Sequence, residues 1–164
     1  MVYIIGGLPG AGKTTYANDL AKKVNGIVFS TDIWMSDLFW MDKVPGEDVE
    51  WALERTDRCE KRMVKTCIQL AKINVPSILD IGFVNLKWRQ KTYKSLDEDT
   101  IPFEVHFLEA SRETRWERVQ KRNSQKGETY SFKVTEEMLD FTDKVHDPID
   151  QKEMSGRLIK VNTE

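Results

Sequence analysis

Short apolar runs alternate with longer segments of mixed polarity along the 164 residues of the chain. The runs have the length of strands, and the first, third and fourth are almost continuously apolar, as parallel strands buried on both faces are. The longer segments carry apolar positions at helical spacing and end at glycine, asparagine or proline. The pattern predicts strands at 2–5, 27–29, 77–81, 103–108 and 157–161, and helices at 13–24, 33–41, 47–73, 86–96, 111–122 and 135–144.

Strands that alternate with helices in this way predict an α/β fold, with a parallel sheet covered by helices on both faces. A Pro45-Gly46 turn and a polar loop at 123–129 are expected between elements, and Ser111 and Thr135 are expected to cap helices. No repeat or linker divides the chain, and its length suits one hydrophobic core. We therefore expect a single domain over residues 1–164.

Composition restricts the cellular location and the classes of partner that we expect for the protein. The formal net charge is −2, so overall basicity does not point to nucleic acid. No apolar run approaches the roughly 20 residues of a membrane helix, and the apolar N-terminus is too short for a signal peptide. Cys59 and Cys67 fall in one predicted helix, roughly 12 Å apart along its axis, which is too far for a disulfide. We expect buried thiols, a cytoplasmic location and no membrane partner.

A glycine-rich segment between the first strand and the first helix is typical of phosphate binding. It comprises Gly7, Leu8, Pro9, Gly10, Ala11, Gly12, Lys13 and Thr14, a glycine followed by four residues and Gly-Lys-Thr. Its glycines allow backbone N–H groups to point at phosphate oxygens, with help from the helix N-terminus. We expect Lys13 to reach the β- and γ-phosphates, Thr14 to bind Mg²⁺, and Thr15 to contact phosphate. The pattern predicts ATP or GTP as the bound nucleotide.

Two aspartates lie at the ends of predicted strands, where ligands bind in open parallel sheets. Asp32 follows the second strand, and Asp80 lies near the end of the third. A phosphotransferase needs a carboxylate to accept the proton of the acceptor, and Asp32 is the candidate; it could also cap the helix that begins at Ile33. Asp80 is expected to hold Mg²⁺, through water, or to orient the acceptor. A buried, unpaired carboxylate would otherwise be costly.

Arginines line the predicted helix at 111–122. Arg115, Arg118 and Arg122 share one face, and Arg112 lies one turn before them. Arg118 and Arg122 are the candidates for stabilising charge on the transferring phosphoryl group. For the set as a whole, the alternative is a solvated basic face paired with Glu113 and Glu117.

Aromatic residues gather on the expected acceptor side. Trp34 and Trp40 could line a pocket or pack in the core, whereas Trp51 and Trp88 are expected in the core. His106 is expected to be structural, and His146 to lie at the surface.

These features together resemble the small P-loop kinases related to zeta toxins, chloramphenicol phosphotransferase and the kinase domain of polynucleotide kinases. More closely, the chain resembles a bacterial group of short AAA-type ATP-binding proteins. The resemblance rests on GGLPGAGKTT (6–15), STDIWM (30–35), ILDIGF (78–83) with Arg89, RVQKRN (118–123) and FKVT (132–135). It implies a three-layer α/β/α kinase core with five parallel strands, Asp32 as the base, and a helical lid at about 111–134 that carries Arg118 and Arg122.

One departure from the related polynucleotide kinases bears on the acceptor. They place an arginine three residues after the aspartate, where this chain has Met35. A small neutral molecule is therefore expected rather than nucleic acid. The resulting hypothesis is an ATP- and Mg²⁺-dependent kinase for a hydroxyl of a small molecule, not a mechanical AAA motor. The alternatives are a nucleotide-binding regulator or slow NTPase without an acceptor, and a polynucleotide or nucleotide-sugar kinase.

Overall fold

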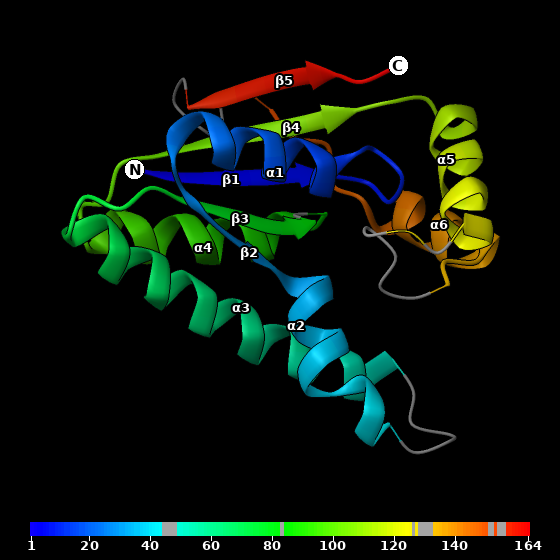
Figure 1. The fold of residues 1–164 in the computed structure, drawn as a ribbon, viewed down its shortest axis with the longest axis horizontal. Helices are drawn as coiled ribbons and strands as arrows, with labels where there is room; N and C mark the ends of the chain where they lie inside the picture. The colour runs from blue at the N-terminus through cyan, green and yellow to red at the C-terminus, as the bar shows by residue number, and fades with distance from the viewer. Residues whose placement is uncertain (44–48, 83, 126, 128–132, 151–152, 154–156) are drawn as a thin grey trace.

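The computed structural model describes residues 1–43, 49–82, 84–125, 127, 133–150, 153 and 157–164. One or more helices separate each strand from the next along the chain (Figure 1). In chain order the elements are β1 (Val2–Gly7), α1 (Lys13–Val24), β2 (Ile27–Ser30), α2 (Thr31–Leu38), the 3₁₀ helix η1 (Trp40–Asp42), α3 (Val49–Lys72), β3 (Ser77–Gly82), α4 (Leu86–Glu98), β4 (Phe103–Glu109), α5 (Arg112–Gln125), α6 (Glu136–Val145) and β5 (Leu158–Asn162).

The five strands form one parallel sheet in the order β2-β3-β1-β4-β5. The predicted α/β class and the five parallel strands are thus confirmed, and β3, the strand that carries Asp80, lies beside β1. The register shifts between Ile5 and Gly6 of β1, which pair with Asp80 and Gly82 of β3. Ile81 is therefore an extra residue on β3, and such a bulge next to a site re-aims the neighbouring side chains.

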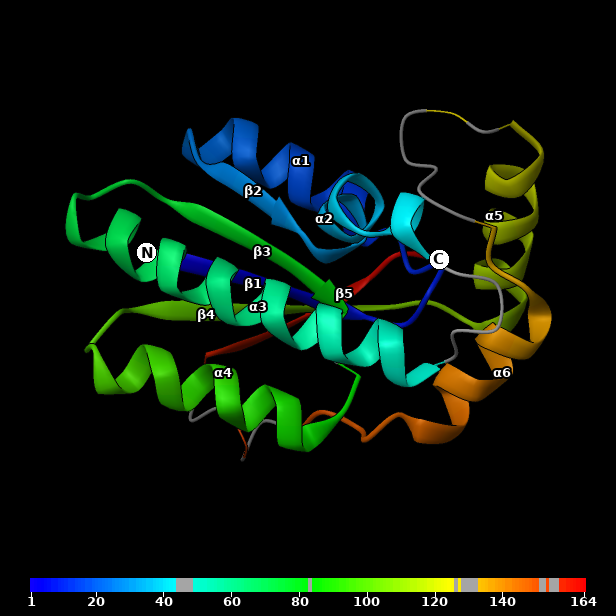
Figure 2. The same cartoon turned by 90° about the horizontal axis from the view of Figure 1, so that it is seen from below.

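Helices cover both faces of the sheet. Helix α1 lies on one face, and α3 and α4 lie on the other (Figure 2). Alternate side chains of each strand pack against the helices on opposite faces of the sheet, because successive strand residues point to opposite faces. Val2 and Ile4 of β1 belong to the core cluster under α3 and α4, whereas Ile5 packs with α1. The first helix matches its predicted bounds, and Asn25 ends it in the left-handed conformation.

Two helices differ from their expected bounds in ways that bear on the site. Helix α2 begins at Thr31 rather than Ile33, and a 3₁₀ turn replaces its expected last residues. Helix α5 continues to Gln125, so a loop does not begin at Asn123 as expected. The Asn123 side chain donates to the Val134 carbonyl at 2.7 Å and accepts from the Val134 N–H at 3.2 Å, which joins the helix to a distant segment. The expected Pro45-Gly46 turn lies outside the described residues.

Helices α5 and α6 lie beside each other at the carboxyl end of the sheet (Figure 1). They enclose a small apolar cluster of their own, with Val119 and Leu139 fully buried. Ser111 and Thr135 accept hydrogen bonds from backbone N–H groups at the helix starts, as predicted. The proposed lid at 111–134 falls partly outside the described residues. Within the described part of the chain, no helix could cross a membrane.

Candidate active site

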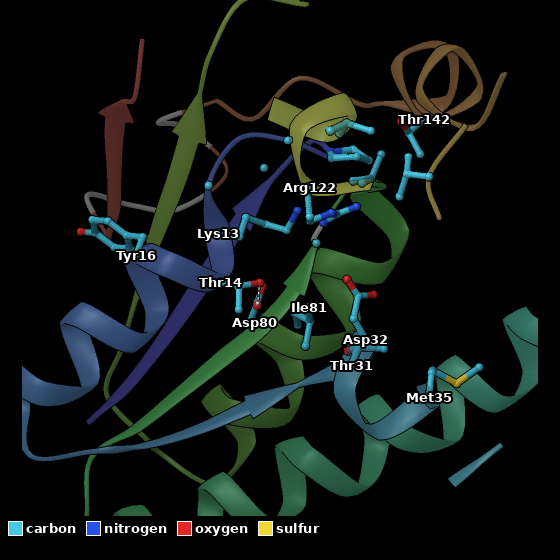
Figure 3. Close-up of a pocket in the computed structure, with 18 of the residues that line it drawn as sticks. Lys13, Thr14, Tyr16, Thr31, Asp32, Met35, Asp80, Ile81, Arg122 and Thr142 are labelled. Atoms are coloured by element: carbon cyan, nitrogen blue, oxygen red, sulfur yellow. Dashed lines mark hydrogen bonds between the residues drawn. The ribbon is translucent and has the colours of Figure 1, made fainter. Parts of the chain in front are cut away.

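A cavity of about 790 Å³ opens where the strands end, between α1, α2, α3, α5 and α6 (Figure 3). All four residues expected to take part in catalysis line it: Lys13, Asp32, Arg118 and Arg122. Both expected metal-binding residues, Thr14 and Asp80, line it as well. Its size is sufficient for a nucleotide and a small second ligand, because ligand pockets commonly measure about 300–1,000 Å³.

The glycine-rich loop forms one end of the cavity, called here the phosphate end. Gly12 adopts φ 88° at the N-cap of α1 and offers no side-chain cap, so the first N–H groups of the helix are available to a ligand. A Cβ on Gly10, at φ 83°, would lie 2.4 Å from the Arg115 carbonyl oxygen of α5. Only glycine therefore fits at this contact.

The other loop residues divide into two groups. Gly7, Pro9 and Thr15 line the cavity, whereas Leu8 and Ala11 do not. The Leu8 carbonyl accepts hydrogen bonds from the Ala11 N–H at 3.1 Å and from Lys13 Nζ at 3.3 Å. The Leu8 carbonyl thus stabilises the turn of the loop and holds the Lys13 ammonium group over it.

Thr14 and Asp80 meet in the floor of the phosphate end. The Thr14 hydroxyl donates to Asp80 Oδ2 at 3.0 Å, as Figure 3 shows. Burial raises the pKa of the Asp80 carboxyl group, Lys13 and the Thr14 hydrogen bond oppose that rise, and the Asp32 charge adds to it. A buried carboxylate in this position would be stabilised by a cation that brings water ligands, because Mg²⁺ keeps several waters and takes few protein oxygens.

Asp32 lies at the other end of the cavity, called here the acceptor end. It sits in the first turn of α2, and Figure 3 shows its carboxylate pointing into the cavity. Asp32 is not an N-cap, because the helix begins at Thr31 and Ser30 takes the N-cap position. The capping alternative is therefore wrong. The hydroxyl of buried Thr31 turns away and contacts the Met63 sulfur at 4.0 Å.

The four arginines of α5 separate into two pairs. Arg118 and Arg122 line the cavity. Arg122 Nε is buried without a hydrogen-bond partner in the described structure, whereas Arg118 donates to the Thr163 carbonyl. An unpartnered guanidinium N–H beside Lys13 favours an anionic ligand, because burying it unpaired is costly.

Arg112 and Arg115 instead join α5 to α6. Arg112 pairs with Asp140 and with Glu136 at 3.3 Å, and buried Arg115 pairs with Asp143 at 2.9 Å. The alternative of a solvated face paired with Glu113 and Glu117 is therefore wrong for these two arginines, since their acidic partners come from α6. Because Arg115 is buried and Arg112 is partly exposed, the Arg115 pair is the one expected to fix the position of α5 against α6.

The tryptophans divide differently from the prediction. Trp51 is buried in the core as expected, but Trp88 is 41% exposed and lines the cavity, so its assignment to the core is wrong. Trp34 and Trp40 were each expected either to line a pocket or to pack in the core. Trp40 lines the cavity and Trp34 does not, and both also pack against the core. The acceptor end thus has aromatic walls.

Both histidines are structural. His106 in β4 is buried as expected, and its Nδ1 lies 2.7 Å from the hydroxyl oxygen of Tyr16. His146 is half-buried and stacks on Phe107 with ring centres 5.6 Å apart, so its surface assignment is wrong. Arg89, part of the resemblance, is fully buried away from the cavity and pairs with Glu153 at 2.7 Å. Both Cys59 and Cys67 are buried free thiols, as predicted.

Several cavity residues carry no signal that the sequence analysis used. Helix α3 contributes Ala52, Thr56 and Glu60, and α6 contributes Met138 and Thr142. The α3 residues are spaced by four and form one stripe along the helix. That spacing is visible in the sequence, but which stripe of a 24-residue helix faces a cavity depends on its packing against the sheet.

Comparison with known proteins assigns the chain to a family. The sequence matches the family described as AAA domain over residues 2–148, which is most of the chain. The chain belongs to the AAA domain family. Among curated proteins, none matches the sequence.

Solved structures place this AAA domain among P-loop kinase folds. Chaetomium thermophilum Kti12 in complex with ADP-AlF3 superposes with a TM-score of 0.69 at 15% identity, covering 99% of this chain and 89% of its own. A gluconokinase from Sinorhizobium meliloti 1021 superposes with a TM-score of 0.68 at 14% sequence identity. The match covers 98% of this chain and 81% of the gluconokinase. The Mycobacterium tuberculosis APS kinase CysC, in complex with AMPPNP and APS, superposes with a TM-score of 0.60 at 17% sequence identity. The match covers 77% of this chain and 72% of that kinase. At these identities the likeness establishes the fold.

The residues of this AAA domain fit a nucleotide with a magnesium ion. The loop amides, Lys13 and Arg122 supply donors and positive charge, and Thr14 with Asp80 supplies oxygen ligands. No group of three or more histidine, cysteine or acidic side chains that could hold a metal occurs among the residues that the structure describes. A magnesium ion held through one or two protein oxygens, water and phosphate needs no such group.

Proposed function

We propose that the protein is a kinase that uses ATP with Mg²⁺ and transfers the γ-phosphoryl group to a hydroxyl of a small molecule. One observation carries this proposal: a single cavity holds cations and loop amides at one end and the Asp32 carboxylate at the other. A nucleotide alone would need only the phosphate end. A second, aromatic-walled end with an exposed carboxylate suits an acceptor that is aligned with the phosphate.

Each residue has a defined part in the proposed transfer. The loop amides and Lys13 bind the β- and γ-phosphates, and Thr14 and Asp80 would hold the metal, which neutralises phosphate charge when bound. Asp32 accepts the proton of the acceptor hydroxyl as its oxygen forms a bond to the γ-phosphorus. The bond from that phosphorus to the bridging oxygen breaks, and ADP leaves. Arg118 and Arg122 stabilise the charge that spreads over the transferring group.

The printed names of the similar structures support a small-molecule acceptor, because they include a gluconokinase and a sugar kinase. Met35, buried at 4% exposure beside Asp32, offers no charge to a nucleic-acid phosphate. A cytoplasmic enzyme would meet both ATP and such acceptors.

Phosphate transfer from γ-labelled ATP with Mg²⁺ tests the proposal. The wild type is compared with Asp32→Asn on four acceptor pools: a small-metabolite extract, antibiotics with free hydroxyls, nucleotide sugars, and an oligonucleotide with a 5′ hydroxyl. We expect a labelled small-molecule product that falls by about 10²–10⁴-fold in Asp32→Asn, the range of general base catalysis.

Asp37→Asn is the matched control, because Asp37 is exposed on the same helix and does not line the cavity. It should retain wild-type transfer. Full activity in Asp32→Asn would remove Asp32 from the mechanism. ATP binding or slow hydrolysis without a labelled product in any pool would instead indicate the regulatory or NTPase alternative, and a product from the oligonucleotide alone would indicate a polynucleotide kinase.

A further inference from the structure

The two ends of the cavity differ in charge. Among the described residues that line it, the cations are Lys13, Arg118 and Arg122, and all three belong to the phosphate end. The described lining of the acceptor end comprises Thr31, Asp32, Met35, Trp40, Ala52, Thr56, Glu60 and Trp88. Its titratable groups are thus two carboxyl groups, Asp32 and Glu60, without a cation. An acceptor with a phosphate or carboxylate of its own would find no cation here and would face the Asp32 charge.

Nearby cations are engaged elsewhere. Lys43 lies over the Trp40 ring, 5.1 Å from its centre, and Arg55 lies over the Trp51 ring at 4.1 Å. Neither lines the cavity. Both make a cation–π contact in these positions, so neither is positioned to bind an anionic acceptor.

Glu60 is a carboxyl group without an assigned partner. It is half-buried, and it makes no hydrogen bond or ion pair to any other described residue. It ends the α3 stripe of Ala52 and Thr56, whose small side chains leave room in front of it. A carboxyl group that is partly removed from water and unpaired is costly, and a ligand that hydrogen-bonds to it would recover that cost.

The neighbouring cations do not form an ion pair with Glu60. Lys61 on the same helix and Lys91 on α4 both pair with Asp57 rather than with Glu60. Burial raises the pKa of Glu60 to about 8, the Asp57 charge adds to the rise, and Lys91 opposes it. Asp32 of α2 is the other carboxyl group at this end of the cavity. At neutral pH, Glu60 is therefore mostly a neutral carboxyl group, which can both donate and accept a hydrogen bond.

We propose that Glu60 is a second acceptor-binding residue, and that the acceptor is an uncharged molecule with at least two hydroxyl groups. One hydroxyl faces Asp32 and is phosphorylated, and another pairs with Glu60. Trp40 and Trp88 offer apolar faces to the carbon skeleton of such a polyol. This inference rests on the proposed kinase function and names the class of its acceptor.

The test uses polyol skeletons of four to six carbons that differ in charge. One pool is neutral (erythritol, xylitol, sorbitol, glucose and myo-inositol), one is cationic (glucosamine), and one is anionic (gluconate and glucose 6-phosphate). Binding is measured by calorimetry with a non-hydrolysable ATP analogue and Mg²⁺, and transfer is measured with γ-labelled ATP. We expect binding and transfer with a member of the neutral pool.

Variants of Glu60 test its role. Glu60→Ala should raise the KM for the neutral acceptor by about 10-fold or more and leave kcat within a few-fold, because a lost hydrogen bond to a bound hydroxyl weakens binding. Glu60→Gln keeps a donor and an acceptor, so it should behave as the wild type at pH 7. The wild-type KM should change above pH 8, and that of Glu60→Gln should not. Glu54→Gln, exposed on the same helix, is the control.

Four results would overturn this inference: an unchanged KM in Glu60→Ala, preference for the anionic pool, preference for the cationic pool with loss in Glu60→Gln, or neither binding nor transfer with any neutral member. Its failure differs from failure of the kinase proposal. Transfer to an anion that is lost in Asp32→Asn would refute the acceptor class but support the kinase. Neutral binding that is lost in Glu60→Ala, without transfer, would support the acceptor class but refute the kinase.

Discussion

The two ends of the cavity are built in different ways. The phosphate end is made mostly by consecutive residues, Gly7 to Thr15, whose backbone conformation carries the chemistry. The acceptor end is made by single side chains from α2, η1, α3 and α4. Its composition therefore depends on how four elements pack together. A backbone-built site serves one common ligand, whereas a side-chain-built site can differ from one relative to the next.

Substituting Arg122 should have the largest effect on the phosphate end. Arg122→Met removes a guanidinium group whose Nε is buried and unpartnered, so the ligand-free protein should melt no lower than the wild type. Phosphate transfer should fall by roughly 10²–10³-fold, because charge stabilisation of the transition state is lost. Steady-state transfer kinetics and thermal melting of the same samples measure both effects.

Arg112→Met is the matched control for that substitution. Arg112 lies on the same helix, is half-exposed and pairs with acidic residues of α6 rather than facing the cavity. Transfer should stay within a few-fold of wild type. Equal losses in the two variants would mean that α5 acts through its position alone and that Arg122 does not meet the phosphate.

A smaller effect is expected at the acceptor end, from Trp88. Trp88→Ala should raise the KM for the acceptor by about 10-fold and leave the affinity for ATP unchanged, because Trp88 lines only the acceptor half. Trp51→Ala is the contrasting variant: it removes a buried ring and should lower the free energy of unfolding by about 3–5 kcal/mol. Calorimetry for ATP, acceptor kinetics and denaturant unfolding separate the two. A changed ATP affinity in Trp88→Ala would contradict the division of the cavity.

The same contrast explains what could be predicted from the sequence. The five strands and the position of the glycine-rich loop between β1 and α1 follow from apolar periodicity and local motif context, so they were predicted. Glu60 was not, because its place depends on which stripe of α3 faces the sheet. Trp88 was wrongly assigned to the core, since an aromatic ring at helical spacing looks the same in the sequence whether it packs in the core or lines a cavity.

The smallest expected effect concerns the dependence of stability on pH. The pKa of Glu60 is raised to about 8 in the folded protein from an ordinary 4.5. Between these values the folded state retains a proton that the unfolded state has lost, so stability falls as pH rises and levels off above about 8. Glu60→Gln should therefore melt above the wild type at pH 9. The two should coincide near pH 4. An unchanged difference across this range, measured by thermal melting, would contradict the raised pKa.

The ion pairs between α5 and α6 have a consequence for how the two substrates bind. Arg115 and Asp143 join the helix that carries Arg122 to the helix that carries Met138 and Thr142, which line the cavity as well. A displacement of α5 on phosphate binding would therefore move α6 with it. If the acceptor contacts Met138 or Thr142, binding of one substrate would change the affinity for the other, and thermodynamic linkage requires the same factor in both directions. The order in which ATP and acceptor are added would change the pathway but not that factor.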